Sequence, residues 1–184
     1  CNNGCEVTIW SPFKEEVELL SEKRTNERLL KDIFLPDSIN ITDDMSVVEG
    51  DTLTIIATPS TVVRETARKL SAYKDLGIVV NVAKGLEKGT LERLSQVIAD
   101  ELPTSSVVVL SGPSHAEEVA RNIPTSLVAA SKSVAAAEAV QSIVSSETLR
   151  IYTSHDLVGV ELGGALKNVI AIAAGACDGM CLGD

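Results

Sequence analysis

Aromatic residues and positive charge are both scarce in this sequence. Phe, Tyr and Trp make up 3% of the 184 residues, so a hydrophobic fraction of 45% must build the core mainly from Val, Ile, Leu and Ala. Lys and Arg number 16 against 26 Asp and Glu, which gives a net charge of −10. Because nucleic-acid binding requires a basic surface, this balance argues against nucleic acid as the main partner. A small anionic substrate is compatible with it, since two local lysines can hold one.

Targeting and membrane segments are also missing. No N-terminal stretch has the order of a signal peptide. No apolar run reaches the roughly 18 residues of a membrane helix, and the longest candidate is interrupted by Glu161, Lys167 and Asn168. We therefore expect a cytoplasmic protein without stable membrane insertion. The chain starts at Cys1 without Met and stops at Asp184 after a helical pattern, so we expect a piece of a longer protein.

Cysteine usage does not favour a metal site. The four cysteines form two pairs at i,i+4 spacing, Cys1 with Cys5 and Cys177 with Cys181. Zinc sites have tighter spacing on loops, so a structural zinc module is the least favoured interpretation. We expect reduced thiols and no bound metal.

Strand-like and helix-like segments alternate along the chain, which is typical of an open α/β sheet with a mostly parallel strand order. Several strand-like runs are continuously apolar, as in strands buried on both faces. The expected strands are 6–10, 52–58, 78–83, 107–111, 126–130 and 149–153, and the expected helices are 13–31, 61–73, 90–100, 114–122 and 134–144. Thr90 and Ser133 are the expected N-caps of the third and fifth helices.

The pattern changes after residue 153. Residues 154–180 are rich in Ala and Gly and predict one long helix without strands. We therefore expect residues 1–153 to form an α/β domain, and residues 154–184 to begin a second, helical domain.

One lysine lies inside this small-residue helix. Residues 157–177 contain only two charged side chains, Glu161 and Lys167. A buried lysine has a lowered pKa, which suits general acid/base chemistry near neutrality. The alternative is a solvated lysine on an amphipathic helix.

Two further motifs follow buried strands, at the edge where open α/β sheets bind ligands. Lys84 and Gly85 come after the strand 78–83, and Gly112 and Ser114 come after the strand 107–111. A helix that begins near Ser114 would offer backbone N–H groups to an anion. The alternatives are a solvated loop lysine and an ordinary Ser N-cap. His115 is too weak a signal to assign as a base.

A Gly-x-Gly-x-x-Gly loop is absent. If the chain binds a dinucleotide, that loop must precede Cys1, and Trp10 would end the second strand of the domain. The residues after Trp10, Ser11 to Lys14, include neither an acid for a ribose hydroxyl nor an Arg for a 2′-phosphate. The preference between NAD and NADP therefore stays open.

Six blocks, in order and across nearly the whole chain, resemble the bacterial-type NAD(P)-dependent glycerol-3-phosphate dehydrogenase family. They are residues 2–10, 34–36, 84–87, 111–119, 159–169 and 174–179. The Gly-Pro-Ser-His-Ala-Glu-Glu and Gly-Gly-Ala-Leu-Lys-Asn blocks are the most specific. The resemblance implies a Rossmann-like NAD(P)-binding domain followed by the first helix of an all-α domain.

The resemblance also implies a reaction. NAD(P)H would deliver hydride to dihydroxyacetone phosphate, giving sn-glycerol 3-phosphate for phospholipid synthesis. Lys167 would be the catalytic acid/base, and Lys84 would contact both substrate and cofactor. The remaining implied contacts are substrate-binding Gly112, Ser114 and Asn168, and cofactor-binding Ala116 and Pro12.

The chain departs from the family at both ends. The glycine-rich loop and most of the helical domain are missing, so we expect these 184 residues alone to be inactive. The alternatives are a related two-domain dehydrogenase of hydroxy acids or sugar phosphates, and a non-catalytic nucleotide-binding fragment. A homodimer is possible, because the apolar helix after residue 154 would be exposed.

Overall fold

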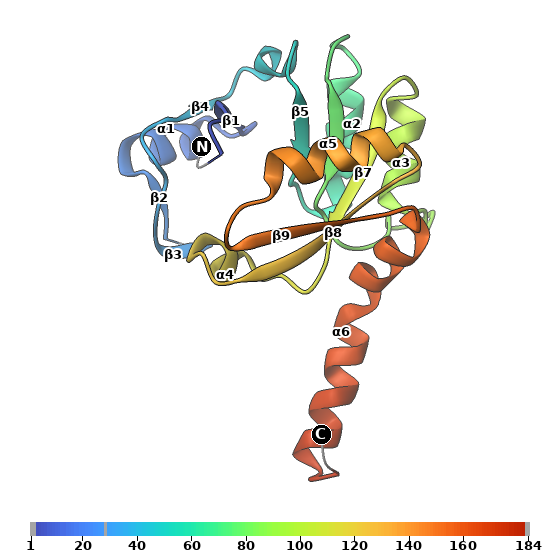
Figure 1. The fold of residues 1–184 in the computed structure, drawn as a ribbon. Helices are drawn as coiled ribbons and strands as arrows, with labels where there is room; N and C mark the ends of the chain where they lie inside the picture. Colours follow the sequence, from blue (N-terminus) through green and yellow to red (C-terminus); the bar gives the residue numbers. More distant parts are fainter. Residues whose placement is uncertain (1–2, 28, 183–184) are drawn as a thin grey trace.

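A five-stranded sheet forms the centre of the molecule (Figure 1). The computed structural model describes residues 3–27 and 29–182. The order is β5 (Leu53–Ile56), β6 (Ile78–Asn81), β7 (Ser106–Ser111), β8 (Thr125–Ser131) and β9 (Leu149–Ser154). All neighbouring pairs are parallel except β7 and β8, which are antiparallel. The predicted mostly parallel α/β fold is therefore confirmed.

Helices cover both faces of this sheet. On one face α2 (Val63–Leu70) and α3 (Leu94–Glu101) pack in one core cluster with Val79, and on the other α5 (Val134–Val144) packs in a second cluster with Val80. Val79 and Val80 are adjacent and both fully buried. Because successive side chains of a strand point to opposite faces, both faces of β6 are covered, which explains its continuous apolar sequence.

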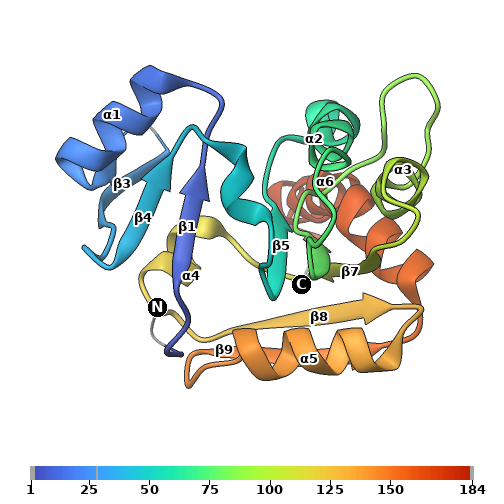
Figure 2. The same ribbon diagram turned by 90° about the horizontal axis from the view of Figure 1, so that it is seen from above.

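A smaller unit lies to one side of the five-stranded sheet (Figure 2). In it β1 (Val7–Trp10) pairs in parallel with β4 (Ile39–Thr42), and α1 (Lys14–Lys23) follows β1. The chain then forms a hairpin of β2 (Thr25–Asn26) and β3 (Leu30–Phe34).

The helix predicted for residues 13–31 is wrong in its second half. Helix α1 ends because Arg24 takes a left-handed conformation with φ of 53° and donates its N–H to the Leu20 carbonyl. The turn then leads into the hairpin. Strand β4 was not predicted, because it is only four residues long and none of them is fully buried.

Three other helix starts were predicted with mixed success. Ser133 caps α5 as expected, since its hydroxyl accepts from the Ala136 N–H at 3.3 Å. The helix expected from residue 90 begins only at Leu94, and the Thr90 hydroxyl instead donates to Glu87 at 2.6 Å. The helix expected from residue 114 begins later, as α4 (Ala116–Ala120). Two short 3-10 turns, η1 (Met45–Val48) and η2 (Ser60–Val62), flank β5.

The predicted long C-terminal helix is present as α6 (Leu157–Gly179), capped by Asp156, which accepts from the Gly159 N–H at 2.8 Å. Leu157 packs on β7 and β8, and the helix then projects away from the sheet (Figure 1). In the described part of the chain α6 is the one helix long and apolar enough to cross a membrane by length and composition. That is weak support for a membrane segment, because core helices of soluble proteins can have the same length and apolar composition.

Candidate functional site

The loop after β6 holds the first candidate residue, Lys84. Buried Asn81 shapes its start, since its side-chain oxygen accepts from the Ala83 N–H at 3.2 Å and its amide donates to the Ala83 carbonyl at 3.1 Å. Gly85 has φ of 132°, and a Cβ there would lie 3.2 Å from the Ser60 hydroxyl. The chain bends at Gly85, in a backbone conformation that glycine adopts readily, next to Lys84 at the carboxyl edge of the sheet.

Lys84 reaches across to the loop after β7. Its ammonium donates to the Gly112 carbonyl at 3.0 Å and to the hydroxyl and carbonyl of Ser114 at 3.3 and 3.4 Å. The structure therefore brings together three of the predicted site residues from two strand ends. Ser114 is not a helix cap here, because His115 occupies the N-cap position of α4.

Gly112 is at a close approach of two strand segments. A Cβ at this position would lie 2.9 Å from the Ser126 carbonyl oxygen and 3.1 Å from Leu127 Cα. Any larger residue would have to move either the neighbouring segment of β8 or the backbone of residue 112, whose own carbonyl accepts from Lys84.

Helix α6 crosses the end of β7 at the same place. A Cβ on Gly164 would lie 2.7 Å from the Ser111 hydroxyl and 3.7 Å from Lys84 Cγ. Lys167 follows three residues later, which places it on the next turn of the helix. Burial of Lys84 lowers the pKa of its ammonium, and the positive charge of Lys167 lowers it further. The charge of one lysine thus affects the pKa of the other.

The expected burial of Lys167 is wrong for this structure. Lys167 and its neighbour Asn168 are both exposed, like the rest of α6 from Leu166 onward. The charged residue of α6 that is buried is Glu161, with 6% of its surface exposed.

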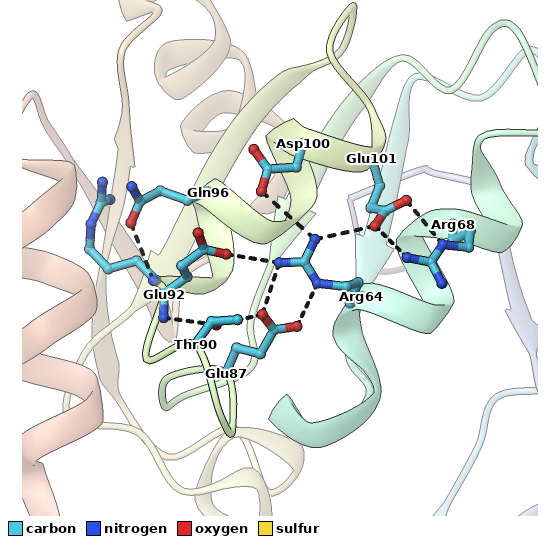
Figure 3. Close-up of polar contacts among 9 residues, drawn as sticks. Arg64, Arg68, Glu87, Thr90, Glu92, Gln96, Asp100 and Glu101 are labelled. Atoms are coloured by element: carbon cyan, nitrogen blue, oxygen red, sulfur yellow. Dashed lines mark hydrogen bonds and ion pairs between the residues drawn. The ribbon is translucent and has the colours of Figure 1, made fainter.

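The loop that begins with Lys84 is held to α2 by ion pairs (Figure 3). Arg64 donates to both carboxylate oxygens of Glu87, at 2.6 and 2.8 Å, and to Glu92 at 2.8 Å. It also donates to Glu101 of α3 at 3.2 Å, and Arg68 donates to the same carboxylate at 2.9 Å. This two-pronged geometry fixes a loop that has little regular structure.

The Arg64 guanidinium holds the pKa of Glu87 down to about 2 from its usual 4.5, and the Thr90 hydroxyl adds to this effect. A depressed folded-state pKa contributes stability that is present above about pH 4.5 and is lost as pH falls toward 2. We therefore expect Arg64→Gln to reduce the loss of stability between these pH values, measured by urea unfolding at a series of pH values. Lys132→Gln, which removes an exposed lysine that has no ion pair among the described residues, is the control and should leave that slope nearly unchanged. Equal slopes for the original protein and Arg64→Gln would contradict the assignment.

The model for the N-terminus of NAD-dependent glycerol-3-phosphate dehydrogenase matches residues 1–137, and the model for its C-terminus matches residues 156–184. The chain belongs to the NAD-dependent glycerol-3-phosphate dehydrogenase family.

Individual relatives agree. A glycerol-3-phosphate dehydrogenase [NAD(P)+] of Desulfitobacterium hafniense is 48% identical over 98% of this chain and 52% of its own length, and one of Clostridium perfringens is 44% identical over 100% and 56%. The crystal structure of glycerol-3-phosphate dehydrogenase from Coxiella burnetii has a TM-score of 0.88 at 32% identity, over 100% of this chain and 57% of that one. The chain thus spans about half the length of the curated relatives it matches.

The NAD(P) cofactor that the family implies fits the carboxyl edge of the sheet. The Thr58 hydroxyl, just after β5, is buried and has no hydrogen-bond partner within the described residues. An orphaned buried hydroxyl is costly and is well satisfied by a polar ligand. The Thr58 hydroxyl thus offers a bound dinucleotide a polar partner at the same edge of the sheet as Lys84 and the Gly112 loop.

Besides Lys84, the other two predicted cofactor contacts lie in different parts of the chain. Ala116 begins α4, two residues after Ser114. Pro12 is exposed after β1. Beside it lies Asp43, whose carbonyl accepts from the Trp10 indole at 3.1 Å and whose carboxylate is 3.8 Å from Lys14. Sequence reasoning missed Asp43 because β4, which delivers it, was not predicted.

The cysteines are not assembled into a metal centre in the described part of the chain. Cys5, Cys177 and Cys181 are free and exposed, and Cys1 lies outside the described residues. No group of three or more potential metal ligands occurs within residues 3–27 and 29–182.

Proposed function

We propose that the complete protein carrying this chain interconverts dihydroxyacetone phosphate and sn-glycerol 3-phosphate with NAD(P)H or NAD(P). The observation that carries the proposal is the meeting of Lys84, Gly112 and Ser114 at the carboxyl edge of the sheet, beside the helix that bears Lys167. The chain's family membership supports this chemistry for that edge.

The proposed roles follow from the charges. Bound NAD(P)H would supply hydride to the carbonyl carbon of the substrate. Lys167 would donate a proton to the carbonyl oxygen during reduction and take it back during oxidation. Lys84 would stabilise the negative charge that develops on that oxygen, while Ser114 and the Gly112 carbonyl hold its ammonium in place. Asn168 would orient the substrate, and Ala116 and Pro12 would contact the cofactor.

The organisation of the whole protein is part of the proposal. Residues 1–153 would be the nucleotide-binding domain and residues 154–184 the start of the helical substrate domain. We propose a cytoplasmic location and a role in supplying glycerophospholipid synthesis. The exposed apolar side chains of α6, Val169, Ile170 and Ile172 among them, support contact with a further domain or with a second copy in a homodimer. Without such a partner, the 184 residues are expected to be inactive.

The test is NAD(P)H oxidation by the complete protein with dihydroxyacetone phosphate, with intact mass measured on the same sample. We expect substrate-dependent oxidation and chiral sn-glycerol 3-phosphate as product. Activity with a 2-oxo acid or another sugar phosphate, but not with dihydroxyacetone phosphate, would replace the proposal with a related dehydrogenase. Cofactor binding without turnover of any of these substrates would point to a nucleotide-binding protein instead.

A further inference from the structure

Glu161 is a buried carboxylate with a complete set of partners. Its Oε1 accepts from the Ser95 backbone N–H at 2.8 Å, and its Oε2 accepts from the Ser95 hydroxyl at 2.6 Å and from Arg93 at 2.7 Å. Arg93 also donates to the Ser95 hydroxyl at 3.0 Å, which closes the cluster. Arg93 and Ser95 lie at the N-terminal end of α3, where the helix dipole favours an anion. The Glu161 carboxylate of α6 is therefore held by hydrogen bonds at the start of α3.

These contacts carry much of the attachment of α6. Within residues 3–27 and 29–182, Glu161 makes all the hydrogen bonds between α6 side chains and the α/β body. Leu157 adds apolar packing on β7 and β8, and from Leu166 onward the helix is exposed. The direction of the outer helix is consequently set in its first two turns. Lys167 lies six residues beyond Glu161, about 9 Å along the helix axis.

The loop that carries Arg93 also carries Lys84. Residues 84–93 begin with Lys84 and end with Arg93, and Arg64 braces the middle of this loop through Glu87. One short segment thus carries Lys84 at one end and the clamp for the Lys167 helix at the other.

We propose that Glu161, clamped by Arg93 and Ser95, is a positioning residue that fixes the orientation of α6 and so holds Lys167 beside Lys84. The inference rests on the proposed function, since it takes Lys167 as the acid/base. Loss of the clamp lets α6 swing about its first turn, and a small angular change there displaces Lys167 more than it displaces Gly164.

The first test is steady-state kinetics of the complete protein with Glu161→Gln. This change keeps the side-chain length and an acceptor for the Ser95 N–H, but removes the charge that pairs with Arg93. We expect kcat to fall roughly 10- to 100-fold, as for a displaced catalytic group, with KM for NAD(P)H within about twofold of the original. Ser95→Ala, a milder change, should shift kcat in the same direction by less.

A matched control separates positioning from stability. Thr54→Val removes one buried hydrogen bond, from the Thr54 hydroxyl to the Leu76 carbonyl at 2.8 Å, in β5 rather than in α6. It should lower the thermal midpoint and leave kcat unchanged. Equal kcat values for Glu161→Gln and Thr54→Val would overturn the proposal.

The second test needs no turnover. Lysines labelled by reductive 13C-methylation report the pKa of Lys84 by NMR, with Lys167→Ala as the reference for a removed neighbour. Neutralising Glu161 by itself would lower the pKa of nearby lysines, whereas displacement of Lys167 would raise the pKa of Lys84. A rise in Glu161→Gln toward the Lys167→Ala value supports the proposal, and a fall or no change overturns it. If the original protein fails to reduce dihydroxyacetone phosphate, the proposed function fails while this readout still decides the positioning.

Discussion

Alanine in place of Lys167 should lower kcat for dihydroxyacetone phosphate reduction by the complete protein roughly 10²- to 10⁴-fold, the range typical of a lost general acid. The positive charge of Lys167 lowers the pKa of Lys84. The side chain is exposed, so its removal leaves no buried cavity. Cofactor binding, followed by NAD(P)H fluorescence, should stay within a few-fold of the original protein. The loss should therefore appear in kcat and kcat/KM together.

Two companion variants define the role of this lysine. Lys167→Arg keeps the charge but cannot release a proton at accessible pH, so it should be nearly as slow as the alanine variant. Lys132→Ala removes an exposed lysine from the turn between β8 and α5 and should retain full activity. If Lys167→Ala keeps activity within a few-fold, the acid/base lies elsewhere. If the kcat of Lys167→Arg is close to that of the original protein, residue 167 contributes only its positive charge.

The second large effect is expected from two neighbouring glycines of α6. A Cβ on Gly164 would lie 2.7 Å from the Ser111 hydroxyl, whereas a Cβ on Gly163 would meet nothing within 4 Å. Ser111 is buried, so Gly164→Ala must move either its hydroxyl or the helix. We expect Gly164→Ala to be about 1–3 kcal/mol less stable than Gly163→Ala. If the helix is what moves, it carries Lys167 with it and kcat should fall about tenfold or more; if only the hydroxyl rotates, the change appears in stability alone.

Gly163→Ala is the matched control, with the same added methyl group on the same helix. It should be slightly more stable than the original protein, since alanine favours helix by up to about 1 kcal/mol over glycine. Both variants are measured by urea unfolding and by kcat. Equal stability and equal activity for the pair would show that α6 does not approach Ser111 as described.

Continuous apolar strands and the helix signals around them made the central fold predictable. Val79 and Val80, buried on opposite faces of β6, explain why an apolar run predicted a covered parallel strand. The antiparallel pairing of β8 with β7 was not predictable, because β8 is an apolar run like β6 and β7, which pair in parallel. Helix α1 was predicted too long because the left-handed turn at Arg24 has no Gly to signal it.

The site was predicted only in part. Strand ends correctly placed Lys84 near Gly112 and Ser114, because carboxyl ends of adjacent parallel strands share one edge. Burial was expected of Lys167, which is exposed, whereas no role was assigned to Glu161, which is buried. Glu161 shares a helix face with Leu157 and Gly164 at i,i+4 and i,i+7 spacing, while Lys167 lies off that face. The sequence does not show which face the sheet covers, and Arg93 lies 68 residues from its partner.

The position of Trp10 has a spectroscopic consequence. It is the only tryptophan of the chain, and it lies in β1, which pairs with β4 and not with the five-stranded sheet. Its indole N–H donates to the Asp43 carbonyl in the turn after β4. Intrinsic fluorescence therefore reports on the smaller unit, while far-ultraviolet circular dichroism is dominated by the helices packed on the larger sheet. Overlaying the two signals during denaturation reveals whether both units melt as one cooperative body.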